Sequence, residues 1–88
     1  MIDLTFFRLV NCPYCRQADK WIAELMDENP AYKDIHINHI NEDEQADLAD
    51  SYDYYYVPSF FLGEKKLHEG AATKEIIKKV LDYCIAAS

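Results

Sequence analysis

Two cysteines three positions apart are the residues of this sequence best suited to chemistry. Cys12 and Cys15 enclose Pro13 and Tyr14, and this spacing is typical of thiol–disulfide exchange or of a metal site. An apolar run over residues 2–10 comes before them, and a segment with helical periodicity follows. The pattern therefore predicts that both thiols lie where a strand leads into a helix.

The first turn of a helix favours a negatively charged sulfur. Its backbone N–H groups lack partners within the helix, and the aligned peptide dipoles add a positive potential. Pro13 suits the first helical position, where its fixed φ angle fits and its missing N–H costs nothing. We expect Cys12 to ionise more readily than an ordinary cysteine and to attack disulfides. Cys15, one turn further in and less exposed, is expected to resolve the mixed disulfide.

A purely structural role for this cysteine pair is the competing interpretation. A structural zinc needs four ligands, and the other candidates are scattered over different predicted elements, namely Cys84, His36, His39 and His68. We therefore predict redox chemistry and no metal site. Cys84 falls on the apolar stripe of the last predicted helix and is expected to be an inert core thiol.

Composition narrows the class of protein. The 88 residues, half of them apolar, suffice for one small domain over residues 1–88, which we expect to be a monomer. A net charge of −7 argues against nucleic-acid partners and against an anionic membrane surface, both of which require basic patches. The sequence carries no recognisable secretion signal or membrane span, and three cysteines are too few for a disulfide scaffold. These features predict a cytoplasmic protein.

Periodicity and breaker residues predict seven elements. They are a strand over 2–10, a helix from Pro13 to about Asn29, a strand over 34–40, a short acidic helix over 44–51 capped by Asn41 or Asp43, strands over 59–62 and 65–69, and a last helix capped by Thr73. The first strand is apolar on both sides and is expected in the middle of the sheet.

This order, β-α-β-α-β-β-α, predicts an α/β fold. The first two strands should pair in parallel through a right-handed crossover, and the last two should form an antiparallel hairpin. The result is a four-stranded mixed sheet with helices on both faces, for which the first and last helices are needed as cover.

The predicted order, with Cys-x-x-Cys at the first junction and a proline before the third strand, resembles the minimal thioredoxin fold. Cys12-Pro13-Tyr14-Cys15 resembles the active-site tetrapeptide of dithiol glutaredoxins. The resemblance implies that Pro58 is a cis-proline facing the cysteines. It also implies that the backbone of Val57 pairs with a cysteine-containing substrate, as a single rung of strand addition. Tyr14 is expected to stay exposed beside that substrate.

Other positions depart from the glutaredoxin pattern. Where the family usually has a basic residue that holds a glutathione carboxylate, this chain has Leu9, with Arg8 one place earlier and so on the other face of a regular strand. Tyr56 stands in place of a common threonine. Glu69 and Gly70 replace part of a glycine-rich turn that binds glutathione, and Glu69 would repel a carboxylate. Arg8, Tyr56 and Gly70 are therefore only candidate contacts.

The resemblance implies a thiol–disulfide oxidoreductase that reduces protein disulfides or glutathione mixed disulfides through Cys12 and Cys15. No bound cofactor is expected, and the electron donor is either glutathione or a thioredoxin-reductase-type enzyme. Family members can also bridge an iron–sulfur cluster through two such thiolates, an option that weak glutathione binding disfavours. Two alternatives remain, a glutathione-independent thioredoxin-like reductase and a non-catalytic binding module that uses the tyrosines of residues 52–56.

Overall fold

The structure, a computed structural model, describes residues 2–87. In this range the chain forms four strands, three α-helices and one 3₁₀ helix, in the order β1 (Ile2–Arg8), α1 (Pro13–Glu28), η1 (Pro30–Asp34), β2 (Ile35–Asn41), α2 (Ala46–Asp50), β3 (Ser59–Leu62), β4 (Lys65–Glu69) and α3 (Lys74–Ala87). The order of strands and α-helices predicted from the sequence is confirmed, and η1 is an addition to it.

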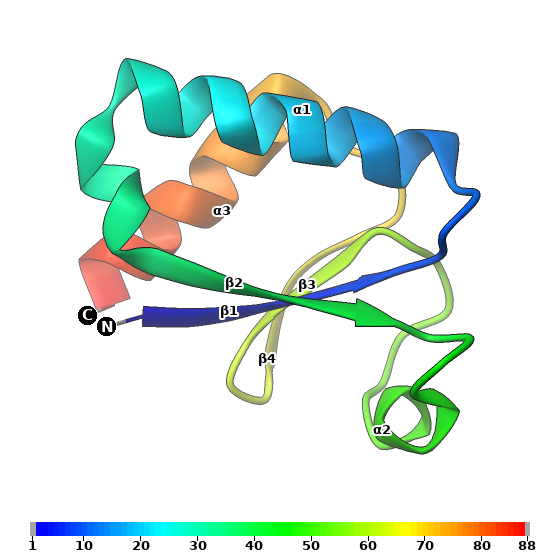
Figure 1. The fold of residues 1–88 in the computed structure, drawn as a ribbon. Helices are drawn as coiled ribbons and strands as arrows, with labels where there is room; N and C mark the ends of the chain where they lie inside the picture. Colours follow the sequence, from blue (N-terminus) through cyan, green and yellow to red (C-terminus); the bar gives the residue numbers. More distant parts are fainter. Residues whose placement is uncertain (1, 88) are drawn as a thin grey trace.

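The strands form one mixed sheet in the order β2-β1-β3-β4 (Figure 1). β1 pairs in parallel with β2, with Ile2 opposite Ile35, and antiparallel with β3, with Phe6 opposite Phe60. β4 pairs antiparallel with β3 and forms an edge of the sheet. β1 is central, as predicted, because it carries apolar side chains on both of its faces.

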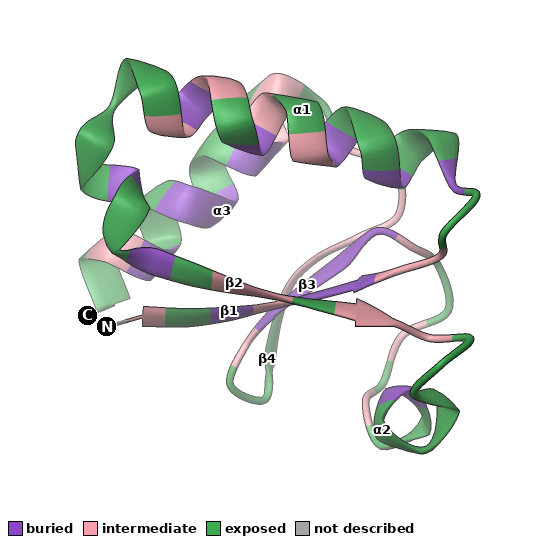
Figure 2. Cartoon of the chain, viewed as in Figure 1, coloured by how far each residue is buried: buried purple, intermediate pink, exposed green. Residues whose placement is uncertain are grey.

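Helices lie on both faces of the sheet, but the two long helices share one face. α1 and α3 pack over Leu4 and Phe6 of β1, in a core cluster that also holds both motif cysteines (Figures 1 and 2). The first and last helices therefore do not cover one face each. On the opposite face, Phe7 and Phe61 pack with Ala49 of the short helix α2.

Aromatic rings extend the cover that α2 gives to this second face. The ring centroid of Phe7 lies 4.7 Å from those of both Tyr52 and Tyr54, and 5.7 Å from that of Phe61. The hydroxyl of Tyr54 also donates a hydrogen bond to Glu42 at 2.7 Å. The first part of the tyrosine-rich segment 52–56 therefore belongs to the core.

The start of α2 differs from the sequence-based expectation. The helix begins at Ala46, with Gln45 as its N-cap and no side-chain hydrogen bond at the cap. The prediction of Asn41 or Asp43 as the cap is therefore wrong. Asn41 ends β2, and its backbone carbonyl accepts hydrogen bonds from the N–H groups of Glu44 and Gln45, which form the turn into the helix.

The start of α3 agrees with the prediction. Thr73 Oγ1 accepts a hydrogen bond from the N–H of Ile76 at 3.2 Å. Lys74 then joins α3 to α1 through ion pairs with Glu24 at 3.0 Å and Glu28 at 2.6 Å. Its positive charge lies near the C-terminal end of α1, which has no basic residue in its own last turn and whose dipole favours a cation there.

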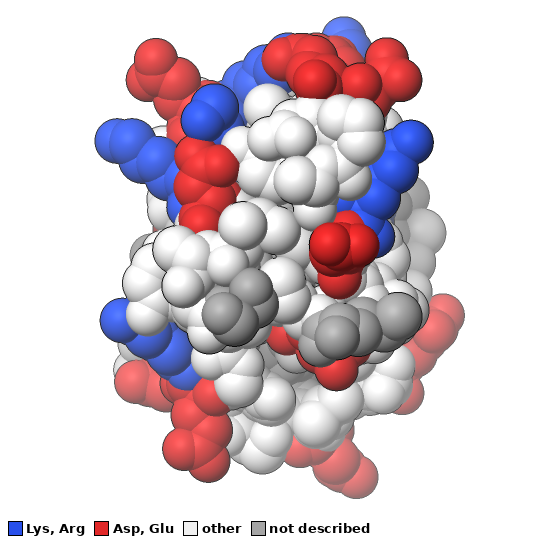
Figure 3. Space-filling view, turned by 90° about the vertical axis from the view of Figure 1, so that its left-hand side faces the viewer, with Lys and Arg blue, Asp and Glu red and all other residues white. Residues whose placement is uncertain are grey.

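Charged side chains of both signs are interspersed on the end of the molecule that carries the termini (Figure 3). On α3, for example, Lys78 pairs with Asp82 at 2.8 Å. Among residues 2–87, none of the helices combines the length and the apolar character that crossing a membrane requires.

Candidate functional site

Cys12 caps the N-terminus of α1. Its backbone is extended, with φ −102° and ψ 110°, and its Sγ accepts a hydrogen bond from the backbone N–H of Cys15 at 3.2 Å. Pro13 follows as the first helical residue, and the carbonyl of Cys12 accepts from the N–H of Arg16 at 3.1 Å. The sulfur therefore lies where the helix offers N–H donors and a positive potential.

The two motif thiols differ in exposure in the expected direction. Cys12 is 8% exposed, whereas Cys15 is fully buried. Burial, followed by the hydrogen bond with Cys12, raises the pKa of Cys15 to about 12. Tyr14, between them, is 55% exposed, as expected for a residue beside an incoming substrate. Cys15 therefore keeps its proton at neutral pH.

The third cysteine lies away from solvent. Cys84 is fully buried on α3, in the same core cluster as the motif cysteines, and burial raises the pKa of its thiol. This environment fits the expected core thiol. Across residues 2–87, no group of three or more His, Cys, Asp and Glu side chains comes together as a set of metal ligands.

The peptide bond between Val57 and Pro58 is cis, and Pro58 is buried. In the sheet register Ser59 lies opposite Phe7, so the cis bond sits beside the end of β1 from which the cysteine loop departs (Figure 1). Val57 packs against the core cluster that contains both motif cysteines. The cysteine motif and the cis bond, far apart in the sequence, are thus brought to the same end of the sheet.

Arg8, a further candidate contact, points into the molecule. Its guanidinium pairs with Asp19 of α1, lies 5.2 Å from the centroid of the Phe6 ring and is 3.4 Å from Nδ1 of His39. Because residues two apart on a strand share a face, Arg8 follows Phe6 onto the face that α1 covers. Its charge lowers the pKa of Cys15, against the larger effect of burial. Arg8 is therefore held by Asp19 and is not directed at a ligand.

The remaining candidates, Tyr56 and Gly70, lie together beside the cis bond. Tyr56 is 70% exposed and Tyr55 is 84% exposed. Gly70 has a φ of +90°, and a Cβ at this position would lie 3.8 Å from the Cβ of Tyr56. The N–H of Gly70 donates to the carbonyl of Pro58 at 2.8 Å. Tyr55 and Tyr56 therefore form an exposed rim next to the site.

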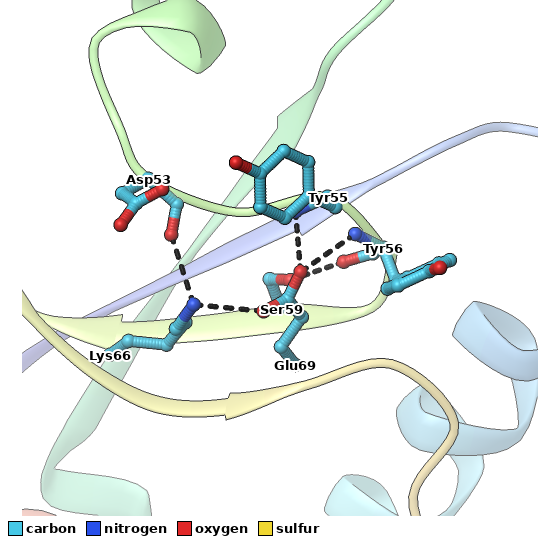
Figure 4. Close-up of polar contacts among 6 residues, drawn as sticks. All are labelled: Asp53, Tyr55, Tyr56, Ser59, Lys66 and Glu69. Carbon is cyan, nitrogen blue, oxygen red and sulfur yellow. Dashed lines mark hydrogen bonds and ion pairs between the residues drawn. The ribbon is translucent and has the colours of Figure 1, made fainter.

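Glu69 has a role that the sequence does not reveal. Sequence reasoning predicts only that it would repel an incoming carboxylate. In the structure its carboxylate accepts hydrogen bonds from the backbone N–H groups of Tyr55 and Tyr56 and pairs with Lys66 (Figure 4). The hydroxyl of Ser59 also donates to the carbonyl of Tyr56. The hydrogen bonds from Tyr55 and Tyr56 reach Glu69 across 14 and 13 positions of the sequence, and no sequence motif indicates them.

Comparison with known proteins places this geometry in a family. A family described as thioredoxin domain matches residues 9–82. A mutant thioredoxin from Halobacterium salinarum NRC-1 has a TM-score of 0.70 at 20% identity, over 96% of this chain and 74% of that one. The germline-specific thioredoxin Deadhead of Drosophila melanogaster has a TM-score of 0.69 at 14% identity, over 93% and 79%. A structure described as a malarial protein has a TM-score of 0.70 at 12% identity, over 96% and 97%.

No curated protein matches the sequence significantly. At such low identities the structural likeness establishes the fold alone. The match of the family to residues 9–82 includes the cysteine motif, the cis bond and the strands β2, β3 and β4, and it begins just after β1. The chain therefore belongs to the thioredoxin domain family.

Proposed function

We propose that this protein is a thiol–disulfide oxidoreductase that reduces disulfides in other proteins, with Cys12 as the nucleophile and Cys15 as the resolving thiol. The observation that carries this proposal is the position of Cys12 Sγ at the N-terminus of α1, 3.2 Å from the N–H of Cys15. Membership of the thioredoxin domain family supports the same class of reaction. Glutathione mixed disulfides are the second substrate class, because the Cys-Pro-Tyr-Cys motif resembles that of dithiol glutaredoxins.

The reaction transfers two electrons in two exchanges. The thiolate of Cys12 attacks one sulfur of the substrate disulfide and forms a mixed disulfide, and the other substrate sulfur leaves as a thiolate that takes up a proton. Cys15 then loses its proton and attacks Cys12 Sγ, which releases the second substrate sulfur as a thiolate. The products are the reduced substrate and an internal Cys12–Cys15 disulfide. No bound cofactor is needed because both electrons come from the dithiol.

Substrate binding uses the surface around the cis bond. The backbone N–H and C=O of Val57 would pair with the backbone of the substrate cysteine, next to Cys12. The exposed side chains of Tyr14, Tyr55 and Tyr56 would contact the residues on either side of it. This arrangement favours an extended segment of a protein over a small disulfide.

Two observations favour a reductase-type enzyme over glutathione as the electron donor. Arg8 is paired with Asp19, and Glu69 presents a negative charge on the rim, so neither offers a cation to a glutathione carboxylate. A thioredoxin-like reduction potential would be about −270 mV, against about −200 to −230 mV for glutaredoxins. In a reducing compartment such as the cytoplasm, a reductase of this type would return the Cys12–Cys15 disulfide to the dithiol.

The decisive experiment mixes the oxidised protein rapidly with glutathione, or with a thioredoxin reductase and NADPH, and follows the appearance of thiols. We expect fast, saturating reduction by the enzyme and slow, non-saturating reduction by glutathione. The opposite pattern would assign a glutathione-linked activity. The same preparation is then assayed with insulin, a protein disulfide, and with a glutathionylated peptide.

Variants of the three cysteines test the roles of the thiols. Cys12→Ser should abolish reduction of both substrates. Cys15→Ser should lose insulin reduction and should retain only turnover of the glutathionylated peptide, with added glutathione releasing Cys12 from the mixed disulfide. Cys84→Ala is the matched control, because it removes a buried thiol outside the motif, and it should retain activity. A Cys12→Ser protein with full activity would disprove the proposed function and favour a binding module.

A further inference from the structure

Lys66 and Glu69 point to the same face of β4 because the strand carries an extra residue between them. Phe60 of β3 pairs with His68, and the next residue, Phe61, pairs with Lys66. Leu67 is therefore left without a partner in the register. In a regular strand, side chains three residues apart point to opposite faces, and a bulge of one residue reverses this relation. The bulge thus allows Lys66 Nζ to lie 2.8 Å from Glu69 Oε1.

This pair, the Lys66–Glu69 clamp, binds the backbone of the loop that precedes the cis bond (Figure 4). Glu69 Oε2 accepts hydrogen bonds from the N–H of Tyr55 and, at 3.0 Å, from the N–H of Tyr56. Lys66 Nζ donates to the carbonyl of Asp53 at 3.1 Å as well as to Glu69. Side chains of the edge strand therefore hold three of the four residues from 53 to 56 by their backbones.

Packing contributes little to holding the middle of this loop. The side chains of Tyr55 and Tyr56 are mostly exposed, so they bury little apolar surface. The hydroxyl of Ser59 binds the carbonyl of Tyr56, and the N–H of Gly70 binds the carbonyl of Pro58, which secures only the end next to β3. Tyr54 is held by its packing on Phe7, but polar contacts with the clamp are the main restraint on Tyr55 and Tyr56.

The charge of Glu69 strengthens these contacts. The ion pair with Lys66 and the two backbone N–H donors lower the pKa of Glu69 to about 2. Its carboxylate is therefore ionised at any working pH, and hydrogen bonds to an ionised acceptor are stronger than those between neutral groups. A glutamine at position 69 would keep the shape and one acceptor oxygen but lose this advantage.

We propose that Glu69, together with Lys66, is a positioning residue that holds the loop 53–58 so that the backbone of Val57 can pair with a disulfide-containing protein. This role rests on the function proposed above. Loss of the clamp frees the backbone of Tyr55 and Tyr56, which directly precedes Val57, so a protein substrate binds less well. The reaction of Cys12 with a small reagent does not use Val57 and stays unchanged.

The test compares Glu69→Ala and Glu69→Gln with the wild type. Glu64→Gln is the control, because it removes one negative charge from the exposed turn of the same hairpin. For insulin reduction, KM should rise about tenfold in Glu69→Ala, the effect of losing one charge-assisted hydrogen bond, with a smaller rise in Glu69→Gln. The kcat, and the rate at which iodoacetamide alkylates Cys12, should stay within about twofold of the wild-type values.

Amide hydrogen exchange provides a readout that does not depend on activity. The N–H groups of Tyr55 and Tyr56 should exchange faster in Glu69→Ala, while those of β1 should keep their wild-type rates. An unchanged KM, unchanged exchange, or an equal loss of insulin reduction and of Cys12 alkylation would each overturn the positioning role. If the wild type reduces no disulfide, the proposed function fails, and the exchange data alone then decide whether Glu69 holds the loop.

Discussion

Phe7 of β1 lies directly opposite Ser59 of β3, and this pairing sets the two halves of the candidate site side by side. The chain leaves β1 toward Cys12 shortly after Phe7, and it enters β3 from Pro58 immediately before Ser59. A slip of one residue in this register would move the Phe7 ring to the wrong face of the sheet. The alignment of the site therefore depends on how firmly Phe7 is packed.

We predict that Phe7→Ala lowers the free energy of unfolding by about 3–5 kcal/mol, because the ring is fully buried and surrounded by other aromatic rings. That loss is a large part of the stability of a small domain, which is about 5–15 kcal/mol. Urea denaturation measures the change, and Phe7→Leu should cost less. A loss below about 1 kcal/mol would mean that this face contributes little to the fold.

The three thiols should react with iodoacetamide at very different rates at pH 7. Cys12 should be alkylated first, since it alone of the three is not fully buried and it lies at a helix N-terminus. Cys15 and Cys84 should stay unmodified until the protein is unfolded, because burial raises the pKa of both. Peptide mapping by mass spectrometry measures the order. Equal rates for Cys12 and Cys15 would contradict the division of roles.

Arg8→Met should slow the second exchange step. The positive charge of Arg8 lowers the pKa of Cys15, so its removal makes the resolving thiol harder to ionise. The mixed disulfide between Cys12 and the substrate should therefore accumulate, which non-reducing gels detect. The lost pair with the partly exposed Asp19 should also cost about 1 kcal/mol of stability or less.

The control for this variant is Lys20→Met, which removes a positive charge from an exposed position on α1. It should leave the lifetime of the mixed disulfide unchanged. If both variants slowed resolution equally, the effect would come from net charge and not from the position of Arg8.

Stability should fall in acid partly through Glu69. Its pKa is about 2 in the folded protein, against an ordinary value of 4.5, so its stabilising effect is complete above about pH 4.5 and is lost as the pH falls toward 2. Glu69→Gln should therefore flatten the fall in stability over this interval. Thermal unfolding between pH 2 and 6 measures the slope. Parallel curves for the two proteins would show that Glu69 has the same pKa folded and unfolded.

Local patterns of the sequence account for the elements and for the place of the motif. The apolar run before Cys12, Pro13 at the helix start and Thr73 before α3 each act over a few residues, so they can be read directly. They do not say which face of the sheet a helix covers. The joint placement of α1 and α3 follows from the packing of the whole chain, and no short pattern encodes it.

The contacts that surround the motif are equally hidden. Arg8 points into the molecule because Asp19 on α1 pairs with its guanidinium. From the sequence alone, an arginine at this position could equally well point into solvent. The Lys66–Glu69 clamp depends on one unpaired residue in β4, and nothing in Lys65-Lys66-Leu67-His68-Glu69 marks where such an irregularity falls. A regular alternation predicts that the two charges face apart, which is the reverse of what is found.

The sulfur of Cys12 has two roles: it is the N-cap acceptor of α1, and it is the atom proposed to react. A serine there offers an oxygen that most helices use for this purpose, so Cys12→Ser deletes the chemistry while sparing the architecture. An alanine deletes both, at a further cost of about 1 kcal/mol. The difference in stability between the reduced wild type and Cys12→Ala therefore measures what the sulfur contributes to the fold when it is not reacting.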